Sequence, residues 1–440
     1  MGEYKKPRNQ AEFDQNFAQK KPLMNQSEAY YESSRCLFCY DAPCMHACPT
    51  HIDIPLFIKQ IHTGNTTGAA QTIFNANWLG NICGKVCPTA QLCEGACVYN
   101  HQQIKPLDIG RLQHYATEQA IRKGEDLFKP VGDNGKKVAV IGAGPAGIAC
   151  ACELRLLGYT VDVYEAKPLP SGLGMHGTAP YKITNREVVD EIDYLQIKLG
   201  FNLLLNQAIT SAPQLSSLEK AYDAIFLGIG LGPTAALSIK GEEKQGVFGA
   251  VEFIEELRLK KHLVEVPERV VVLGGGNTAL DAASESAKMG AQNVTLAYRR
   301  SKSEMGGYDF EYKHAIACGV DTIFNVSPLE ILGEGAVSAV KFIATEIQDG
   351  KRVMVNGTEF LVPCDWVIKA TGQAKFPGLY NLVQGLTLDA SNNVVVNSDF
   401  QTGNPMYFAG GDAVNGGAEV VNAAYEGKKA ARGIDKWLKG

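Results

Sequence analysis

The sequence contains one pattern twice, in which an apolar strand, a glycine turn, a helix and a second apolar strand follow one another. The first copy is "KVAVIGAGPAGIACACELRLLGYTVDVYEA", residues 137–166, and the second is "RVVVLGGGNTALDAASESAKMGAQNVTLAYRR", residues 269–300. Strand and helix patterns that alternate in this way predict a parallel sheet covered by helices. We therefore expect an α/β fold that contains two related units.

Later strands extend the repeat and indicate that the two units are nested. "YDAIFLGIG" (222–230) and "CDWVIKATG" (364–372) are both apolar strands that follow an acidic residue and end in glycine. A last strand, "PMYFAGGDA" (405–413), follows the second unit and leads into a helical segment. We expect this strand to return to the first unit, so that the second unit is an insertion into the first.

The first glycine turn has the spacing of a dinucleotide-binding turn. Gly142, Gly144 and Gly147 fit G-x-G-x-x-G between a predicted strand and a predicted helix, where the helix N-terminus offers free N–H groups to a pyrophosphate. Glu165 ends the second strand, where a carboxylate accepts hydrogen bonds from ribose hydroxyls. A glycine turn that only packs is the alternative. The candidate cofactor-binding residues here are Gly142, Gly144, Pro145, Ala146, Gly147 and Glu165.

The second glycine turn is followed by a strand that ends in residues of the opposite charge. "LGGGNTALD" has alanine at the last glycine position, an accepted variant, and its second strand ends in Arg299 and Arg300 rather than in an acid. Two guanidinium groups suit a 2′-phosphate, which favours NADPH over NADH, although two arginines on a solvated strand end are the alternative. The candidate residues are Gly274, Gly275, Gly276, Asn277, Thr278, Arg299 and Arg300. Two such units predict FAD in the first and a nicotinamide in the second, with hydride passing between them.

Eight of the twelve cysteines lie before residue 100, in a helical and loop-rich region without evident strands. The first group reads C-x2-C-x4-C-x3-C-P from Cys36, close to a ferredoxin run, and the second reads C-x3-C-x5-C-x3-C from Cys83. The chain has no apolar secretion signal, and in a reducing cytosol such density indicates metal rather than disulfides. Two 4Fe–4S clusters fit the eight thiols. Zinc is the rival, but neither group splits into paired zinc-binding knuckles.

Several of these motifs together resemble a known family over nearly the whole chain. The residues that carry the resemblance are "CLFCYDAPCMHACP", "NICGKVCPTAQLCEGAC", "IGAGPAG", "LGGGNTALD", "YRR" and "AGGDAVNGGAEVVNAAYEGKKAA". They are similar to the electron-input module shared by the glutamate synthase small subunit and dihydropyrimidine dehydrogenase. "CPTAQLC" and "DIGRLQ" resemble the dihydropyrimidine dehydrogenase branch, and most of all the flavin and iron–sulfur subunit of its bacterial NAD-dependent form.

The resemblance implies a division of the cysteine groups between two clusters. It assigns Cys36, Cys39, Cys44 and Cys97 to one cluster, and Cys48, Cys87, Cys93 and Gln113 to the other. Cys83 is then not a ligand, although thiolate chemistry alone would prefer it to an amide. Near the flavin the resemblance adds Gly172, Leu173, the loop to Ile183, Gly411, Asp412 and Val420. The sequence departs from the family in "APYKIT" (179–184), where the family has an "IPxxRLP"-like segment. The cofactor preference also differs, because the bacterial relatives are taken as NADH enzymes, whereas the two arginines favour NADPH.

These inferences define the expected domains. We expect a helical iron–sulfur domain at 1–130, a first part of the FAD-binding domain at 131–247, an NAD(P)-binding domain at 248–372 and a second FAD-binding part at 373–440. The formal net charge of −5 gives no basic surface for nucleic acid, and no apolar stretch is long enough for a membrane span. We expect a cytoplasmic protein.

The expected function is an oxidoreductase subunit that passes electrons from NAD(P)H through FAD and two 4Fe–4S clusters to a partner. The chain has no room for an FMN-binding barrel or a pyrimidine site, so the resemblance implies an FMN-containing catalytic subunit that reduces uracil or thymine. A glutamate synthase small subunit or paralogue, a stand-alone NAD(P)H:acceptor oxidoreductase and a zinc-stabilised interaction protein are the alternatives. No residue of the chain itself is expected to act as a catalytic acid or base, because the hydride is transferred by FAD.

Overall fold

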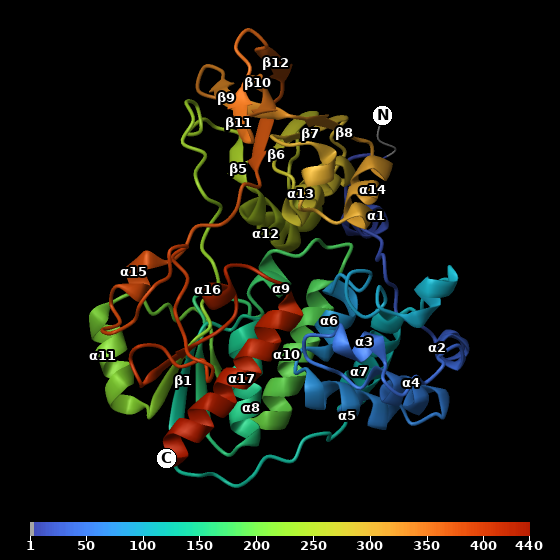
Figure 1. Ribbon diagram of the computed structural model, residues 1–440, viewed down its shortest axis with the longest axis vertical. Coiled ribbons are helices and arrows are strands. Elements are labelled where there is room, and N and C mark those ends of the chain that lie inside the picture. Colours follow the sequence, from blue (N-terminus) through green and yellow to red (C-terminus); the bar gives the residue numbers. More distant parts are fainter. Residues whose placement is uncertain (1–3) are drawn as a thin grey trace. The chain divides into compact units, whose positions relative to one another are not determined.

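The computed structural model describes residues 4–440, which form two compact units (Figure 1). The larger unit contains residues 19–175, 182–231 and 375–440. The smaller unit contains the residues up to 18 together with 176–181 and 232–374. No helix among the described residues is both long and apolar enough to cross a bilayer.

The larger unit begins with short helices that hold the cysteine groups. Helix α4 shows why they form: Asp53 caps its first turn, and the helix buries Ile54, Phe57, Ile58 and Ile61 at the spacing of one helical face. The last helix of the region ends at Gly124, which has a φ of 62°. These elements are α2 (Gln26–Ser34), α3 (Pro43–His46), α4 (Ile54–His62), α5 (Thr66–Ala76), α6 (Gly80–Val86), η1 (Val98–Gln102) and α7 (Ile109–Lys123).

A five-stranded parallel sheet, in the order β14-β4-β1-β2-β3, follows in the same unit. β14 pairs with β4 although the smaller unit separates them in sequence, which confirms that the strand of 405–413 returns to the first unit. The strands are β1 (Lys137–Ile141), β2 (Thr160–Tyr164), β3 (Asn202–Leu204), β4 (Ala224–Leu227) and β14 (Tyr407–Ala409). The helices are α8 (Pro145–Leu156), α9 (Leu173–His176), α10 (Asn185–Leu199), α11 (Ala212–Ala221), α15 (Pro377–Tyr380), α16 (Asp412–Asn415) and α17 (Val420–Lys439).

The smaller unit contains the second parallel sheet, in the order β5-β13-β6-β7-β8. An N-terminal helix, α1, joins its core through Phe13 and Phe17. The strands are β5 (Val247–Gly249), β6 (Arg269–Leu273), β7 (Asn293–Tyr298), β8 (Val320–Phe324) and β13 (Trp366–Lys369). The helices are α1 (Gln10–Asn16), α12 (Ala250–Lys260), η2 (Lys261–Leu263), α13 (Asn277–Lys288), η3 (Lys302–Glu304) and α14 (Asp309–Ala317).

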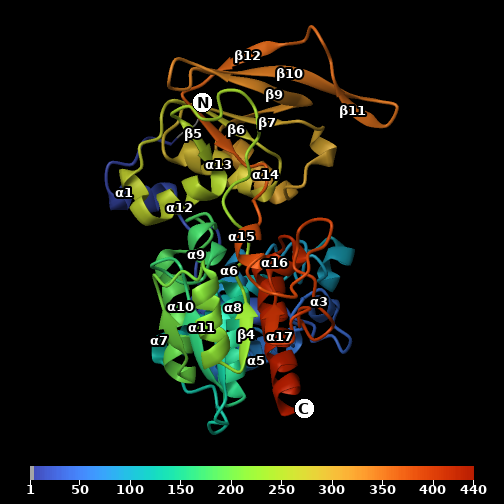
Figure 2. The ribbon, with the colours of Figure 1, turned by 90° about the vertical axis from the view of Figure 1, so that its left-hand side faces the viewer.

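An antiparallel sheet interrupts the repeat in the smaller unit and was not predicted from the sequence. Figure 2 shows it beside the strands β5, β6 and β7. Asp349 and Gly350 both have positive φ and form the turn between the antiparallel strands β10 and β11, a combination typical of a hairpin. The strands are β9 (Val326–Leu332), β10 (Ala339–Gln348), β11 (Lys351–Met354) and β12 (Phe360–Pro363).

Candidate functional site

The first glycine turn joins β1 to α8 through close backbone contacts. Gly142 has a φ of 102°, and a Cβ there would lie 2.4 Å from the carbonyl oxygen of Gly228. Gly144 is the N-cap of α8, with Pro145 at the first helical position. A Cβ on Gly147 would lie 1.9 Å from the carbonyl oxygen of Gly142. The three glycines therefore allow the N-terminus of α8 to lie close to the end of β1, and no side chain of theirs covers that N-terminus.

A Gly147→Ala substitution is expected to release FAD and to destabilise the larger unit by about 1–3 kcal/mol, because the added methyl group has no space. Gly144→Ala is the matched control, since its Cβ meets nothing closer than 3.8 Å and its φ is ordinary. That variant is expected to keep its thermal stability and to lose affinity only for the flavin. Equal melting temperatures for the two variants would contradict this explanation.

Residues from two further segments lie against this turn. Glu165, at the end of β2, accepts hydrogen bonds from the backbone N–H of Ala143 at 2.8 Å and of Lys167 at 2.9 Å. The backbone N–H of Ser171 donates to the carbonyl of Ala143 at 2.7 Å, and a Cβ on Gly172 would lie 3.0 Å from the Cα of Gly144. Leu173 begins α9 directly after it.

The third segment comes from the C-terminal part of the chain. Gly411, with a φ of 74°, approaches the first turn of α8 so closely that a Cβ would lie 2.9 Å from the Cβ of Ala146. Asp412 begins α16 and accepts from the backbone N–H of Ala418 at 3.1 Å, and burial raises the pKa of its carboxyl. Val420 begins α17. The structure thus brings Glu165, Gly172 and Gly411 against the turn at the N-terminus of α8, although Gly411 lies 269 positions after Gly142 in the sequence (411 − 142).

Only part of the loop from Gly172 to Ile183 belongs with these residues. Residues 176–181 are part of the smaller unit, where Tyr181 is buried and donates a hydrogen bond from its hydroxyl to Asp281 on α13. The sequence departs from the family pattern in this stretch, at "APYKIT", and the structure uses its tyrosine as an anchor in the core of the smaller unit.

The second glycine turn joins β6 to α13 in the smaller unit. Gly274 has a φ of 153°, and a Cβ on Gly275 would lie 2.5 Å from the ring of Tyr298. Gly276 is the N-cap of α13 and has open space around its Cα. Asn277 accepts from the backbone N–H of Tyr308 at 2.8 Å, and Thr278 follows it in the first turn of the helix. Arg299 and Arg300 come directly after β7, next to this turn, and both are exposed.

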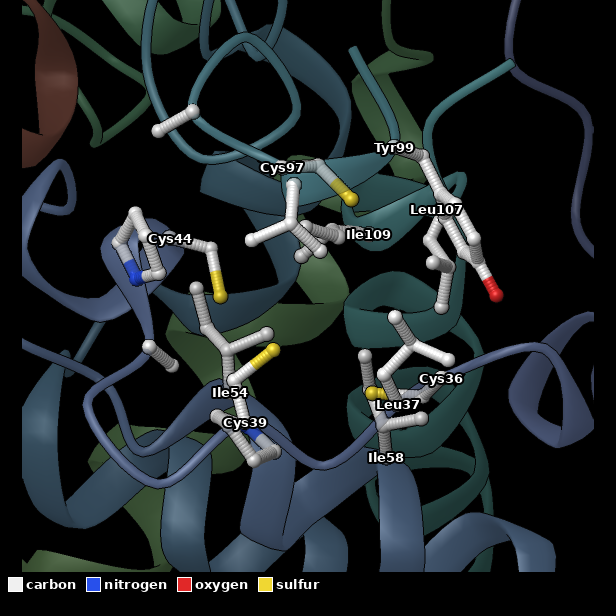
Figure 3. Close-up of a pocket in the computed structure, with 15 residues that line it drawn as sticks. Cys36, Leu37, Cys39, Cys44, Ile54, Ile58, Cys97, Tyr99, Leu107 and Ile109 are labelled. Carbon is white, nitrogen blue, oxygen red and sulfur yellow. The ribbon is translucent and has the colours of Figure 1, made fainter. Parts of the chain in front are cut away.

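Four cysteines of the first predicted set line one cavity. Cys36, Cys39, Cys44 and Cys97 surround about 390 Å³ of space, part of it open to solvent, with Ile54 and Leu107 among its apolar walls. In Figure 3 the sulfur atoms of Cys39, Cys44 and Cys97 point into this space, and Cys36 lies on its border. Burial raises the pKa of the Cys44 thiol to about 12, and it also raises the pKa of Cys36. Such thiols bind as thiolates only when a cation compensates their charge.

The second predicted set lines another cavity, of about 320 Å³, which is also partly open. Cys48, Cys87, Cys93 and Gln113 border it, and so does Cys83. The amide Nε2 of Gln113 donates to the carbonyl of Gly80 at 2.7 Å, so its Oε1 is the atom left for another partner. A hydrogen bond that the Cys87 thiol donates to Cys83 contributes most to the raised pKa of Cys87. The structure therefore brings both candidates for the fourth ligand, the Gln113 amide and the Cys83 thiol, to the same cavity.

The thiols of each set gather around a cavity. A zinc ion requires its ligands about 2.0–2.3 Å away, and within residues 4–440 no group of three or more His, Cys, Asp or Glu side chains is so placed. In a four-iron cluster each thiolate binds a different iron, so the sulfur atoms stand farther apart. The two cavities fit this chemistry.

The second cavity also has a wall from the flavin-binding part of the larger unit. Val421, on the first turn of α17, lines it, and the Glu419 carboxylate is close enough to raise the pKa of Cys87. Val420, which the sequence predicts beside the flavin, lies between these two residues. The first cavity has no residue beyond position 109 in its lining.

A buried carboxylate on α10, that of Glu191, binds the start of α6, the helix that contains Cys83. Glu191 accepts from the backbone N–H groups of Asn81 at 2.6 Å and Ile82 at 2.9 Å, at the start of α6. The pKa of Glu191 is raised from 4.5 to about 8, chiefly by burial; the two N–H groups act to lower it, and the Glu118 carboxylate acts to raise it. No local pattern in the sequence could have found this pair of elements, because Glu191 lies 110 residues from Asn81.

The raised pKa of Glu191 predicts a pH dependence of stability. Because its folded pKa exceeds the unfolded one, the group stabilises the fold fully below about pH 4.5, and this contribution is lost as the pH rises through about 8. The free energy of unfolding is expected to fall by up to about 1.4 kcal/mol per pH unit in this window. A Glu191→Gln variant should lack this slope in chemical denaturation. An unchanged slope would show that other groups cause it.

Two family models match the chain in succession. A model described as dihydropyrimidine dehydrogenase domain II, 4Fe-4S cluster, matches residues 13–125, and one described as pyridine nucleotide-disulphide oxidoreductase matches residues 136–427. The NADPH glutamate synthase small chain of Escherichia coli K12 is 36% identical over 437 residues, which cover 94% of this chain and 92% of that protein. The chain belongs to the family of glutamate synthase small chains and related pyridine nucleotide-dependent oxidoreductases.

Its other relatives include the NAD-dependent dihydropyrimidine dehydrogenase subunit PreT of Salmonella typhimurium, 32% identical over 93% of this chain and 94% of that protein. Among solved structures, FprA from Mycobacterium tuberculosis in complex with NADPH has a TM-score of 0.58 at 20% identity, over 71% of this chain and 85% of that one. The thioredoxin reductase of T. acidophilum has a TM-score of 0.54 at 21% identity, over 69% of this chain and 100% of that one. Both structures share the fold.

The chain is therefore an electron-transfer oxidoreductase with a helical 4Fe–4S domain followed by Rossmann-like FAD- and NADP-binding domains. These findings confirm the fold class, the family and the cofactor types predicted from the sequence. The individual cofactor ligands and the domain boundaries stay predictions, which the geometry above makes testable. Its relatives are named as small chains or subunits, so a catalytic partner is expected.

Proposed function

We propose that the chain is the electron-input subunit of an enzyme that reduces uracil or thymine to the dihydropyrimidine, together with an FMN-containing catalytic subunit. When bound, the flavin would take hydride from NADPH, and the clusters would carry single electrons onward. The residues of this chain hold these groups and exclude water from them. The chain itself supplies no acid or base for the final substrate.

One observation carries this proposal: two separate cavities each border one of the predicted ligand sets, and the second shares Val421 with the helix that begins beside the flavin residues. That order favours transfer from the flavin to the cluster at Cys48, Cys87 and Cys93 first. The cluster at Cys36, Cys39 and Cys44 would be the later one. The sequences "CPTAQLC" and "DIGRLQ" support the pyrimidine branch.

A glutamate synthase small subunit is the second candidate. The relative of that name is 36% identical, compared with 32% for the PreT relative, and both are covered almost completely. Cys83 also borders the second cavity, which permits a ligand set of four thiolates. In this case the flavin and cluster chemistry would be the same and only the partner would differ.

Anaerobic purification with metal and flavin analysis tests the cofactor part of the proposal. We expect about eight irons for each FAD, since each of two clusters holds four. Co-expression with each candidate catalytic subunit from the same genome then tests the substrate. Uracil-dependent NADPH oxidation with the FMN subunit is the expected result, and glutamate formation with a glutaminase-containing large chain would instead establish the second candidate.

The two arginines after β7 predict the nicotinamide preference. Arg299→Ala and Arg300→Ala are each expected to raise the KM for NADPH about tenfold or more, because hydrogen bonds between charged groups contribute about 1.5–3 kcal/mol. The KM for NADH should not change, since NADH lacks the 2′-phosphate. Steady-state dye reduction with both nicotinamides measures this. An equal rise for both would mean that the arginines support the fold of this strand end instead.

A further inference from the structure

Large apolar side chains are exposed on one part of the iron–sulfur domain. Seven such residues lie between positions 19 and 123 of the described chain, and six of them fall between positions 30 and 56. Tyr40 is fully exposed, and Tyr31 is 70% exposed. We call these six residues the aromatic patch: Tyr30, Tyr31, Leu37, Phe38, Tyr40 and Leu56.

The patch is continuous across α2, α4 and the loop between them. The Tyr30 ring stacks on the ring of His62 from α4, with centroids 5.0 Å apart, and Tyr31 meets Tyr30 edge-on at 5.6 Å. The ammonium of Lys59, also on α4, lies 5.8 Å from the centre of the Phe38 ring. Leu56 and Lys59 are one helical turn apart on α4, and Leu37, Phe38 and Tyr40 belong to the same short loop.

The backbone of this loop holds an apolar ring at the surface. Phe38 has a φ of 50°, a conformation that bulky residues rarely adopt, and its side chain is still 37% exposed. Strained conformations of this kind persist where the surrounding structure imposes them, often at functional sites. Burial of Phe38 does not account for the strain.

The aromatic patch meets the first cavity at one residue, Leu37. Leu37 belongs to both, because it is 56% exposed and lines the cavity between Cys36 and Cys39 (Figure 3). The second cavity is the one bordered by α17, and none of the six residues lines it. The exposed apolar surface is therefore next to the first cavity, whose cluster would be the later one to receive electrons from the flavin.

We propose that the aromatic patch is the docking surface for the electron-accepting partner, a stably bound subunit that presents an apolar, uncharged face and its own redox centre above the first cavity. This inference rests on the proposed function, in which the later cluster passes electrons to a partner. Electron transfer slows steeply with distance, so an acceptor must approach the cluster at Cys36, Cys39 and Cys44 closely. The surface beside Leu37 offers that approach.

The character of the patch favours a permanent subunit over a mobile carrier. Weak redox encounters are small and are steered by charge, whereas stable interfaces have aromatic and apolar centres with few charges. Four of the six residues are aromatic and none is charged. Of the charged groups nearby, Arg35 is paired with Glu32 at 2.6 Å, Asp41 contacts the ring of His46 at 2.6 Å, and the Lys59 ammonium lies over the Phe38 ring. Tyrosine also contributes strongly at the centre of interfaces.

A double variant, Tyr31→Ser with Tyr40→Ser, tests this surface in the full-length holoprotein. Its control is Ile347→Ser with Leu361→Ser, which removes two exposed apolar side chains, 61% and 56% exposed, from the antiparallel sheet of the smaller unit. The probe is the purified FMN-containing dihydropyrimidine dehydrogenase catalytic subunit from the same genome, with the glutamate synthase large chain in a parallel arm. The measurements are the Kd of the complex, the iron and FAD content, and NADPH-dependent dye reduction.

The expected result is a Kd at least tenfold higher for the Tyr31 and Tyr40 variant, with unchanged iron, FAD and dye reduction, while the control binds like the unchanged protein. Equal binding by all three proteins would overturn the proposal. So would self-association of the unchanged chain that the Tyr31 and Tyr40 substitutions abolish, since a second copy would then cover the patch. The same tenfold loss against the glutamate synthase large chain alone would support the surface and overturn the pyrimidine assignment. If neither subunit binds the unchanged chain, both proposals are wrong.

Discussion

A Cys48→Ala variant is expected to lose the second cluster and to keep the first, although Cys48 stands in the same thirteen-residue stretch as Cys36, Cys39 and Cys44. The reason is the cavity it faces: Cys48 lines the space shared by Cys87 and Cys93, whereas the three earlier cysteines line the other one. Iron content should fall from about eight to about four per FAD. Anaerobic metal analysis and electron paramagnetic resonance of the reduced protein measure the loss.

Cys44→Ala is the matched control, because it lies only four residues earlier and borders the first cavity. It should remove the other four irons and leave the signal that Cys48→Ala abolishes. An unchanged FAD content in both variants shows that the flavin-binding part of the larger unit has folded. Loss of the same cluster in both variants would refute the division of this stretch between two sites.

The nested sheets could be predicted from the sequence because their signals are local. Each glycine turn lies within a few residues of the strand and helix that it joins, and a Cβ at Gly142 or Gly274 would meet a backbone carbonyl within 2.5 Å. The return of residues 407–409 to the first sheet was expected because a last strand follows the second unit. Such local signals can be recognised without any knowledge of contacts between distant residues.

Other features depend on contacts between distant residues and left no local pattern. Glu191 fixes the start of α6 from 110 positions away, and Tyr181 belongs to the core of the smaller unit although its neighbours in sequence belong to the larger one. The antiparallel sheet was missed for another reason. Its Asp349–Gly350 turn is a recognisable hairpin signal, but it interrupts a repeat that otherwise predicts only parallel strands.

The division of the cysteines between two clusters was predicted neither from local patterns nor from contacts between distant residues. Spacing alone indicated two compact groups, and the family resemblance divided them and introduced Gln113. The two cavities border the sets that the resemblance implied: the short helix α3 ends between Cys44 and Cys48, and Cys97, the residue before η1, lines the cavity of the first set. The fourth ligand of the second set is the point at which residue chemistry and resemblance disagree.

A pair of substitutions at the second cavity should settle that disagreement in favour of the amide. Gln113→Ala is expected to lower the iron content towards four per FAD, whereas Cys83→Ser should leave it near eight. The physical reason is geometric. The bond from Gln113 Nε2 to the Gly80 carbonyl orients the side chain of a buried residue and leaves its oxygen available, while the Cys83 thiol already serves Cys87 as a hydrogen-bond partner.

The two variants control for each other, since both residues lie on helices, are almost fully buried and border the same cavity. If Cys83→Ser loses four irons and Gln113→Ala retains them, the second cluster has four thiolates and the amide only secures the start of α6. An amide ligand leaves the cluster site with one negative charge fewer than a fourth thiolate would, which favours the reduced state. A Gln113→Cys variant that still binds eight irons should therefore show a lower reduction potential for the second cluster in an anaerobic redox titration, and an unchanged potential would mean that residue 113 does not bind the iron.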